Sequence, residues 1–391
     1  MTMAVFKQSL LNFFKSESSI GIVLIMATLF ALLLANSHLA VGYQEFLDIP
    51  VVIKIHEFVI AKPLLLWVND GLMAVFFFMI GMEVKRELLE GRLQDLSKVF
   101  VPTFGAIGGM LVPALIYMLF NANNTVAMQG WAIPMATDIA FALGILSLLG
   151  KRVPIEMKLF LLTLAIIDDL GSIVVIALFF GHGIAPMALG VSSFFILLLI
   201  VMNWRGVTNN TAYVLIGILV WTAVLKSGVH ATIAGVIVGL LIPLKNNKKS
   251  FYELEKSLYT PVNYVILPLF AFVNTGISFS GVDTKNLVDN VTLGIALGLF
   301  MGKQIGIFSF AALAIKLTSK KPNVMSWGQL YGVSVLGGVG FTMSLFIGSL
   351  AFECSGDACI NMIDERIGIL MGSFLSGVVG YFLLKKTLPN Q

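Results

Sequence analysis

Long apolar stretches, separated by short polar connections, follow one another along the whole chain. A helix of about 20 mostly apolar residues is long enough to cross the hydrocarbon core of a bilayer. This pattern predicts twelve membrane-spanning helices, at residues 18–36, 64–84, 99–120, 127–148, 155–180, 184–203, 210–224, 229–244, 256–277, 290–315, 328–350 and 366–385. We therefore expect an all-α polytopic membrane protein.

The basic residues provide a test of these spans, because cytoplasmic loops carry an excess of Lys and Arg. If the N-terminus is cytoplasmic and every span crosses once, the great majority of the 25 Lys and Arg residues lie on the inner side. A wrong number of spans would disrupt this alternation in the rest of the chain. We expect both termini to be cytoplasmic.

Most connections are short, which favours a single transmembrane domain over residues 1–391. The longest connection, about residues 37–63, falls on the outer side and contains IPVVIKIHEFVIAKP. Its β-branched residues and partial alternation are typical of a small hairpin. We expect that hairpin at about residues 45–62, with an irregular loop as the alternative. A strand pair at this position could meet its copy in a homodimer.

The composition agrees with a membrane protein, since 58% of the residues are hydrophobic and 12% are charged, against about 25% charged in soluble domains. The sequence contains no glycine-rich phosphate loop, no metal-type Cys/His cluster and no basic face for nucleic acid. We expect no cofactor and no nucleic-acid partner. Cys354 and Cys359 fall in the last external loop, where a disulfide and two free thiols are both open.

Four charged residues lie well inside the predicted spans: Asp138, Asp168, Asp169 and Lys303. Each costs about 2.5–3.5 kcal/mol at mid-bilayer. A structural salt bridge could explain any one of them. Three acids against one base nevertheless leave a surplus of two carboxylates, which must be protonated or neutralised by a bound cation.

Asp168 and Asp169 stand side by side in LTLAIIDDLGSIVVI. Neighbouring residues of a helix point about 100° apart, so one carboxylate can face a cavity while the other reaches a neighbouring helix. Two such close groups should titrate as a coupled unit. A small hard cation such as Na⁺ takes oxygen ligands, so the cation and the proton would compete for the same oxygens.

Two spans look interrupted at membrane depth. The fourth contains WAIPMATDIAFALG, in which Pro134 is followed by Thr137 and Asp138. The eleventh contains SVLGGVGFTMSLFIG, with glycines at Gly337, Gly338 and Gly340. Close helix packing is the alternative for these glycines.

The two interruptions occupy matching positions in spans 3–5 and spans 10–12, which points to a binding site at a repeat interface. These spans start on opposite sides of the membrane, so the repeat must be inverted. Broken helices present opposed ends with partial charges of about half a unit. Asp138 could offset positive ends, and Lys303 could offset negative ones.

Six segments carry a family resemblance: MATDIAFALGILSLLG, LFLLTLAIIDDLGSIVVIALFF, FFMIGMEVKRELLEG, HATIAGVIVGLLIP, ILPLFAFVNTGI and GGVGFTMSLFIG. Nearly end to end, the chain resembles the NhaA-type Na⁺/H⁺ antiporters. The resemblance implies a bacterial inner-membrane homodimer with two crossed, unwound helices. It also implies electrogenic exchange of cytoplasmic Na⁺ or Li⁺ for external H⁺.

The resemblance also implies roles for individual residues. Asp169 would be the main cation and proton carboxylate, while Asp168 would assist it and pair with Lys303 in one state. Thr137 and Asp138 would complete the unwound site. The alternative that Lys303 carries the second proton itself stays open.

A second charged group stands at the inner end of span 2, in MEVKRELLEGRL, and comprises Glu83, Lys85, Arg86 and Glu87. A solvated helix end is one explanation. The resemblance implies instead a cytoplasmic pH sensor with Glu255 opposite. Histidine is the usual switch near neutral pH, but all four histidines fall toward the outer side, so an internal response must depend on carboxylates. His230 is either a structural polar group or a modulator.

Three other functions stay open from the residues alone. A proton-coupled transporter of another cation would use the same carboxylates. A cation channel is compatible with the broken spans. An intramembrane aspartyl protease would need its two aspartates on separate helices and a Gly-x-Gly-Asp signature; Asp168 and Asp169 are adjacent, and the sequence contains no such signature.

Overall fold

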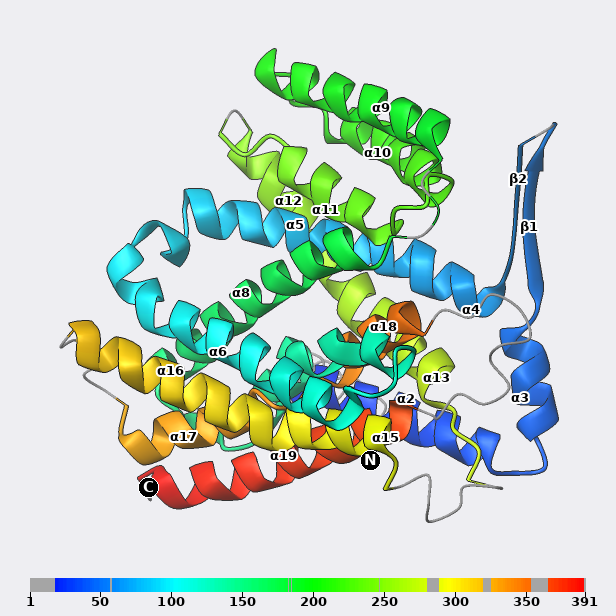
Figure 1. Ribbon diagram of the computed structural model, residues 1–391. Coiled ribbons are helices and arrows are strands. Elements are labelled where there is room, and N and C mark those ends of the chain that lie inside the picture. Colours follow the sequence, from blue (N-terminus) through cyan, green and yellow to red (C-terminus); the bar gives the residue numbers. More distant parts are fainter. Residues whose placement is uncertain are drawn as a thin grey trace, which may run out of the picture. The chain divides into compact units, whose positions relative to one another are not determined.

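The computed structural model describes residues 18–56, 58–181, 183, 185–245, 247–279, 288–318, 325–352 and 365–389. These residues fold mainly into helices (Figure 1) and form two compact units. Unit 1 contains Met1–Leu29, Asp95–Ser172 and Ile277–Gln391, and unit 2 contains Phe30–Gln94 and Ile173–Gly276. The single domain predicted from the short connections stays a prediction. Cys354 and Cys359 lie outside the described residues.

Unit 1 contains the first part of α2 (Ser18–Ala35) and most of α8 (Ile155–Phe179). Its other elements are α6 (Leu96–Asn121), η3 (Ala127–Met135), α7 (Ile139–Ser147), η4 (Gly150–Arg152), α15 (Asn290–Leu297), η6 (Gly298–Gly302), α16 (Lys303–Thr318), α17 (Trp327–Leu336), α18 (Phe341–Ala351) and α19 (Glu365–Thr387).

Unit 2 contains the remaining parts of α2 and α8. Its other elements are α3 (Ala40–Leu47), β1 (Pro50–Ile55), β2 (Phe58–Pro63), α4 (Leu64–Leu66), η1 (Trp67–Leu72), α5 (Met73–Leu89), η2 (Arg92–Gln94), α9 (Pro186–Trp204), α10 (Asn210–Leu225), α11 (Thr232–Leu241), α12 (Lys248–Pro261), η5 (Val262–Ile266) and α13 (Leu267–Thr275).

The helices account for every predicted span. Among the described residues, eight helices are long and apolar enough to cross a membrane, two bent helix pairs pass the same test, and α10 and α11 are shorter apolar helices. Leu119, Leu178 and Phe374 are 79%, 72% and 70% exposed, an arrangement suited to lipid rather than water. The fold expected from the sequence is thus confirmed, although the ninth span begins at Lys248 rather than at residue 256.

Local sequence explains several helix boundaries. Asn209 and Asn247 cap α10 and α12 by accepting hydrogen bonds from backbone N–H groups of the first turn. Ser326 begins α17 with a capping box shared with Gln329, which satisfies donors at both residues. Pro186 occupies the first turn of α9, where its missing N–H is not needed.

The expected hairpin is confirmed as an antiparallel pair of β1 and β2, in which Ile53 faces Ile60 across the strands. Figure 1 shows the two strands together as an arm of unit 2. Its extent differs from the prediction, because residues 40–47 form helix α3 and the strands begin only at Pro50.

Within unit 1, two sets of elements have the same order: a long helix, a bent pair and another long helix. The first set is α6, η3 with α7, and α8; the second is α15 to α16, α17 with α18, and α19. Helices α6 and α16 lie side by side (Figure 1). A Cβ at Gly108 would overlap the carbonyl of Gly306, and the converse also holds, so this close crossing requires glycine.

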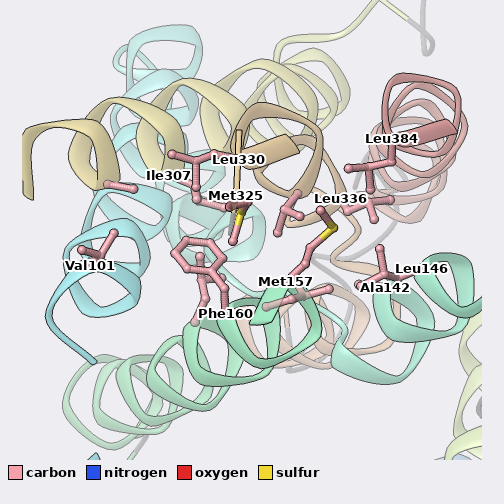
Figure 2. Close-up of a cluster of buried hydrophobic side chains, with 14 of the residues drawn as sticks. Val101, Ala142, Leu146, Met157, Phe160, Ile307, Met325, Leu330, Leu336 and Leu384 are labelled. Carbon is pink, nitrogen blue, oxygen red and sulfur yellow. The ribbon is translucent and has the colours of Figure 1, made fainter. Parts of the chain in front are cut away.

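A large apolar cluster in unit 1 holds these helices together (Figure 2). Figure 2 shows Val101 of α6, Phe160 of α8, Ile307 of α16 and Leu384 of α19 among its side chains. Apolar packing of this kind fixes the polar groups described next, because close-packed cores leave little freedom to shift.

Candidate functional site

Both helix breaks in unit 1 lie against each other. The η3–α7 pair bends by 40° and the α17–α18 pair by 43°. The backbone N–H of Asp138 donates to the Val339 carbonyl at 2.7 Å, and the Thr137 hydroxyl donates to the Gly337 carbonyl at 2.9 Å. Each break therefore supplies a hydrogen-bonding partner for the backbone that the other one exposes.

Glycine makes this close approach possible. A Cβ at Gly340 would lie 2.9 Å from the Ala136 carbonyl oxygen, and a Cβ at Gly338 would overlap the Leu299 carbonyl oxygen. The glycines predicted to interrupt the eleventh span occupy the break between α17, which ends at Leu336, and α18, which begins at Phe341.

Asp138 caps two half-helices at once. Its Oδ1 accepts from the Phe141 backbone N–H at 2.9 Å, as the N-cap of α7. Its Oδ2 accepts from the backbone N–H of Thr342 at 3.1 Å, in the first turn of α18, and also from the Thr342 hydroxyl. A carboxylate is favoured at this place because helix N-termini carry partial positive charge.

Lys303 lies at a helix C-terminus, whereas Asp138 lies at helix N-termini. Its side chain is fully buried, and its three ammonium donors reach the Met135 carbonyl, the Thr137 hydroxyl at 2.9 Å and Asp168 Oδ2 at 2.6 Å. Met135 is the last residue of η3, so the ammonium group lies at a helix C-terminus, where positive charge is stabilised.

The two adjacent carboxylates on α8 are both buried, with Asp168 1% and Asp169 2% exposed. Asp168 reaches a neighbouring helix through its ion pair with Lys303 on α16, in line with the helical geometry expected from the sequence. Its second oxygen, Oδ1, has no hydrogen-bond partner among the described residues.

Three buried carboxylates and one buried ammonium give these groups a formal charge of −2. The helix N-termini at Asp138 and the helix C-terminus near Lys303 carry opposite partial charges of about half a unit each, so they do not cancel this charge. Charge of that size in an apolar environment must be neutralised by protons or by a cation.

A π-helical turn, η6, places Lys303 at its C-terminal end as the first residue of α16. Gly298 and Gly302 are the first and last residues of this turn. A Cβ at Gly298 would lie 2.8 Å from Pro134, and a Cβ at Gly302 would lie 2.7 Å from Pro113. The turn was not predicted from the sequence, nor were Thr342 and the two backbone bonds that Ser373 Oγ accepts from Gly340 and Phe341. Thr342 and Ser373 lie within apolar stretches, and the hydrophobic pattern there does not indicate which hydroxyl caps a helix end.

Residues 11–384 match the family described as Na⁺/H⁺ antiporter 1. The chain belongs to this family. It is 54% identical over 383 residues, which cover 97% of each chain, to the Na(+)/H(+) antiporter NhaA of Yersinia pestis bv. Antiqua (strain Antiqua). The same values apply to the relative of that name from Yersinia pseudotuberculosis serotype O:3 (strain YPIII).

A solved structure of the sodium proton antiporter MjNhaP1 from Methanocaldococcus jannaschii at pH 8 matches with a TM-score of 0.56. The match covers 94% of this chain and 90% of that chain at 15% identity, so it shows a shared fold. Membership of an antiporter family classes the protein as a multi-pass membrane transporter rather than with a class of enzymes.

Within unit 2, the structure brings together Glu255 and three of the four charged residues that the sequence singled out at the inner end of span 2. Arg86 lies 3.6 Å from Glu83, 3.4 Å from Glu87 and 3.1 Å from Glu255. Lys85 does not join them, because its ammonium donates to the Ile242 carbonyl at 2.5 Å. Three carboxylates around one guanidinium form a cluster whose charge depends on pH.

A neighbouring ion pair follows the end of α5. Lys248 Nζ lies 2.6 Å from Glu90 Oε1, and the Tyr252 hydroxyl donates to Glu90 Oε2 at 2.9 Å. The Lys248 hydrogen bond, followed by that of Tyr252, lowers the pKa of Glu90 below its usual value.

His230 lies before α11, which begins at Thr232 rather than at residue 229 as expected. Its Nδ1 is 2.7 Å from the Thr232 hydroxyl, and its Nε2 is 3.6 Å from Asp70 Oδ1. Asp70 Oδ2 pairs with Lys62 of β2 at 2.5 Å. His230 thus belongs to a polar cluster at the base of the hairpin, separate from the Arg86 cluster.

Proposed function

We propose that this protein exchanges cytoplasmic Na⁺ or Li⁺ for external H⁺ across the bacterial inner membrane. The observation that supports the proposal most directly is the formal charge of −2 on Asp138, Asp168, Asp169 and Lys303, buried where two broken helices meet. The printed name of the 54% identical relatives, Na(+)/H(+) antiporter, agrees with it.

Cation and protons act on the same carboxylates. With the site open to the cytoplasm and the carboxylates deprotonated, Asp169 and Asp168 bind Na⁺, aided by Thr137 and Asp138. The loaded site turns outward, and external protons displace the cation. The protonated carboxylates return and release their protons inside. Competition follows because protonation turns carboxylate oxygens from good cation ligands into neutral, weak ones.

Lys303 takes part through its ion pair with Asp168. When a cation binds the carboxylates, the 2.6 Å contact between the two residues loses strength, and the ammonium group can give up a proton instead. If two protons exchange for one Na⁺, one net charge moves inward per cycle. A membrane potential then contributes about 2.3 kcal/mol per 100 mV, so the exchange would be electrogenic.

Three further features belong to this proposal. The Lys and Arg distribution favours a cytoplasmic position for both termini. The Arg86 cluster of Glu83, Glu87 and Glu255 regulates transport with pH, because its three carboxylates share one guanidinium. Among the described residues, β1 and β2 form a two-stranded sheet, and its outer edges suit pairing with a second copy in a homodimer.

Purified protein in liposomes containing a pH-sensitive dye tests the exchange. Addition of Na⁺ or Li⁺ should move protons across the membrane, and K⁺ should not. Asp169→Asn should abolish the signal, while Asp48→Asn, on an exposed carboxylate of unit 2, should leave it intact. Full exchange by Asp169→Asn would refute the proposal, and a K⁺ response equal to that of Na⁺ would favour a transporter of another cation.

A further inference from the structure

Ser172 is a buried polar residue of α8 that the proposed exchange cycle does not use. Its side chain is 1% exposed, and its hydroxyl has no hydrogen-bond partner among the described residues. Some buried helical hydroxyls bond within their own helix: Thr163 donates to the Leu159 carbonyl at 2.8 Å, and Ser334 to the Leu330 carbonyl at 2.8 Å. Ser172 does not make this local bond.

An unsatisfied hydroxyl is costly in an apolar interior, so its direction is informative. Taking Asp168 as the origin, Asp169 points about 100° around the helix and Ser172, four residues on, about 40°. Ser172 thus projects between the two carboxylates. Helical side chains also tilt toward the N-terminus, so the hydroxyl covers the turn that carries Asp168 and Asp169.

The other neighbours of Ser172 on this side of α8 are apolar. Leu164, Ala165 and Ile176 are all buried, and the sulfur of Met110 on α6 is so close to Gly171 that a Cβ there would overlap it. The polar groups nearest to the Ser172 hydroxyl along its helix are therefore the two carboxylates. Asp168 Oδ1 likewise has no hydrogen-bond partner among the described residues.

We propose that the Ser172 hydroxyl is a third α8 oxygen of the cation site, which ligates Na⁺ or Li⁺ together with Asp168 and Asp169. This inference rests on the function proposed above. A hydroxyl offers two lone pairs and one donor, so it can ligate the bare cation and can hydrogen-bond a carboxyl after the cation has left. Alkali cations favour such hard oxygen ligands.

Because a hydroxyl does not ionise near neutral pH, Ser172 should affect cation affinity without affecting proton competition. Ser172→Ala should raise the apparent KM for Na⁺ and for Li⁺ about tenfold, as expected for one lost contact to a charged group. The factor should be the same at every pH at which exchange is measured, and turnover at saturating cation should change little.

Ser172→Cys keeps the size of the side chain but replaces oxygen by soft sulfur, so it should raise the KM as Ser172→Ala does. Ser172→Thr keeps the hydroxyl and should retain the KM of the unaltered protein. Ser334→Ala is the matched control, because it removes a buried hydroxyl that is already bonded within α17; its KM should be unchanged.

The measurement is dye-reported exchange in liposomes, together with the thermal unfolding midpoint of each variant. An apparent KM for Ser172→Ala and Ser172→Cys within about twofold of the unaltered protein, or a fall in turnover alone, would overturn the assignment of Ser172. Asp169→Asn distinguishes a failure of the Ser172 inference from a failure of the proposed function. If Asp169→Asn is inactive while Ser172→Ala has the KM of the unaltered protein, only the Ser172 inference fails. If Asp169→Asn exchanges normally, the proposed function fails first.

Discussion

The buried ion pair between Lys303 and Asp168 leads to a quantitative prediction for Lys303→Met. Methionine has a similar shape, so the substitution removes the charge and leaves only a small cavity. It deletes all three hydrogen bonds of the ammonium group and leaves Asp168 buried without its partner. Breaking a buried pair in this way costs about 3–5 kcal/mol. That loss corresponds to roughly 6–10 °C in unfolding midpoint at about 2 °C per kcal/mol.

The companion variant is Asp168→Asn, which removes the other charge at almost constant shape. Alone it leaves the Lys303 ammonium group buried without a carboxylate and should also destabilise the protein. The double variant contains neither charge. We expect it to be more stable than the sum of the single losses implies, by about 2–3 kcal/mol, because contacting partners are not independent.

The assay is thermal unfolding of the purified protein in one detergent, followed by intrinsic fluorescence and checked by the fraction that stays monodisperse after heating. Lys316→Met is the matched control, since it makes the same substitution at an exposed position of the same helix. The loss for Lys303→Met should shrink at acidic pH, because protonation removes the stranded charge of Asp168. If Lys303→Met loses no more than Lys316→Met, or if the two single losses simply add, the ion pair does not stabilise the site.

Three further substitutions test other parts of the structure. Thr342→Val deletes the hydroxyl that donates to a buried carboxylate, and should cost about 1.5–3 kcal/mol in thermal stability. Gly235→Ala places a Cβ against the Ala74 carbonyl, and should cost about 1–3 kcal/mol by forcing α5 and α11 apart. Glu90→Gln removes the ion pair with Lys248. Because this pair lowers the pKa of Glu90, its stabilisation is present above about pH 4.3 and is lost as the pH falls through the lowered value. The unfolding midpoints of Glu90→Gln and the unaltered protein should therefore differ at neutral pH and converge in acid.

Each of these three predictions has a control or an outcome that would contradict it. Thr342→Ser keeps the hydroxyl and should recover the stability lost by Thr342→Val. Gly190→Ala is the control for the crossing of α5 and α11, since nothing lies within 4 Å of a Cβ there; an equal effect of the two alanines would exclude a steric cause. For Glu90→Gln, a difference in midpoint that persists in acid or in high salt would exclude an exposed ion pair.

Most of the helical architecture follows from the sequence alone. The bilayer requires about 20 apolar residues per crossing, and these are recognised in the sequence as continuous apolar segments. The hairpin was predictable for a similar local reason, the alternation of β-branched residues in residues 50–63. Helix α3 was not predicted, and neither were the π-helical turns η1, η5 and η6. A single wider turn within a membrane-spanning helix does not change the spacing of apolar residues in a way that the sequence reveals.

The buried charged residues were likewise predictable from the sequence, since an Asp or a Lys within an apolar span can be recognised whatever residue it pairs with. The pairing of Asp168 with Lys303 was expected from the family resemblance, but the hydroxyl groups around the breaks were not predicted. Thr342 and Ser373 contact the breaks from helices distant in the chain, and nothing local to them differs from the many hydroxyls that bond within their own helix. Lys85 and Arg86 are adjacent basic residues in one motif, yet only Arg86 joins the carboxylates, because successive side chains leave a helix in different directions.

What the sequence determined by itself is the set of apolar helices and the need to neutralise the charge that three carboxylates and one ammonium group leave, since both depend on the solvation of each residue and not on its neighbours in space. Only the tertiary structure decided how that charge is distributed: Asp138 on two helix N-termini, and Lys303 between a helix C-terminus and Asp168. The reason is physical. Hydrogen bonds and ion pairs require contact within a few ångström, and that contact is set by how the apolar helices pack.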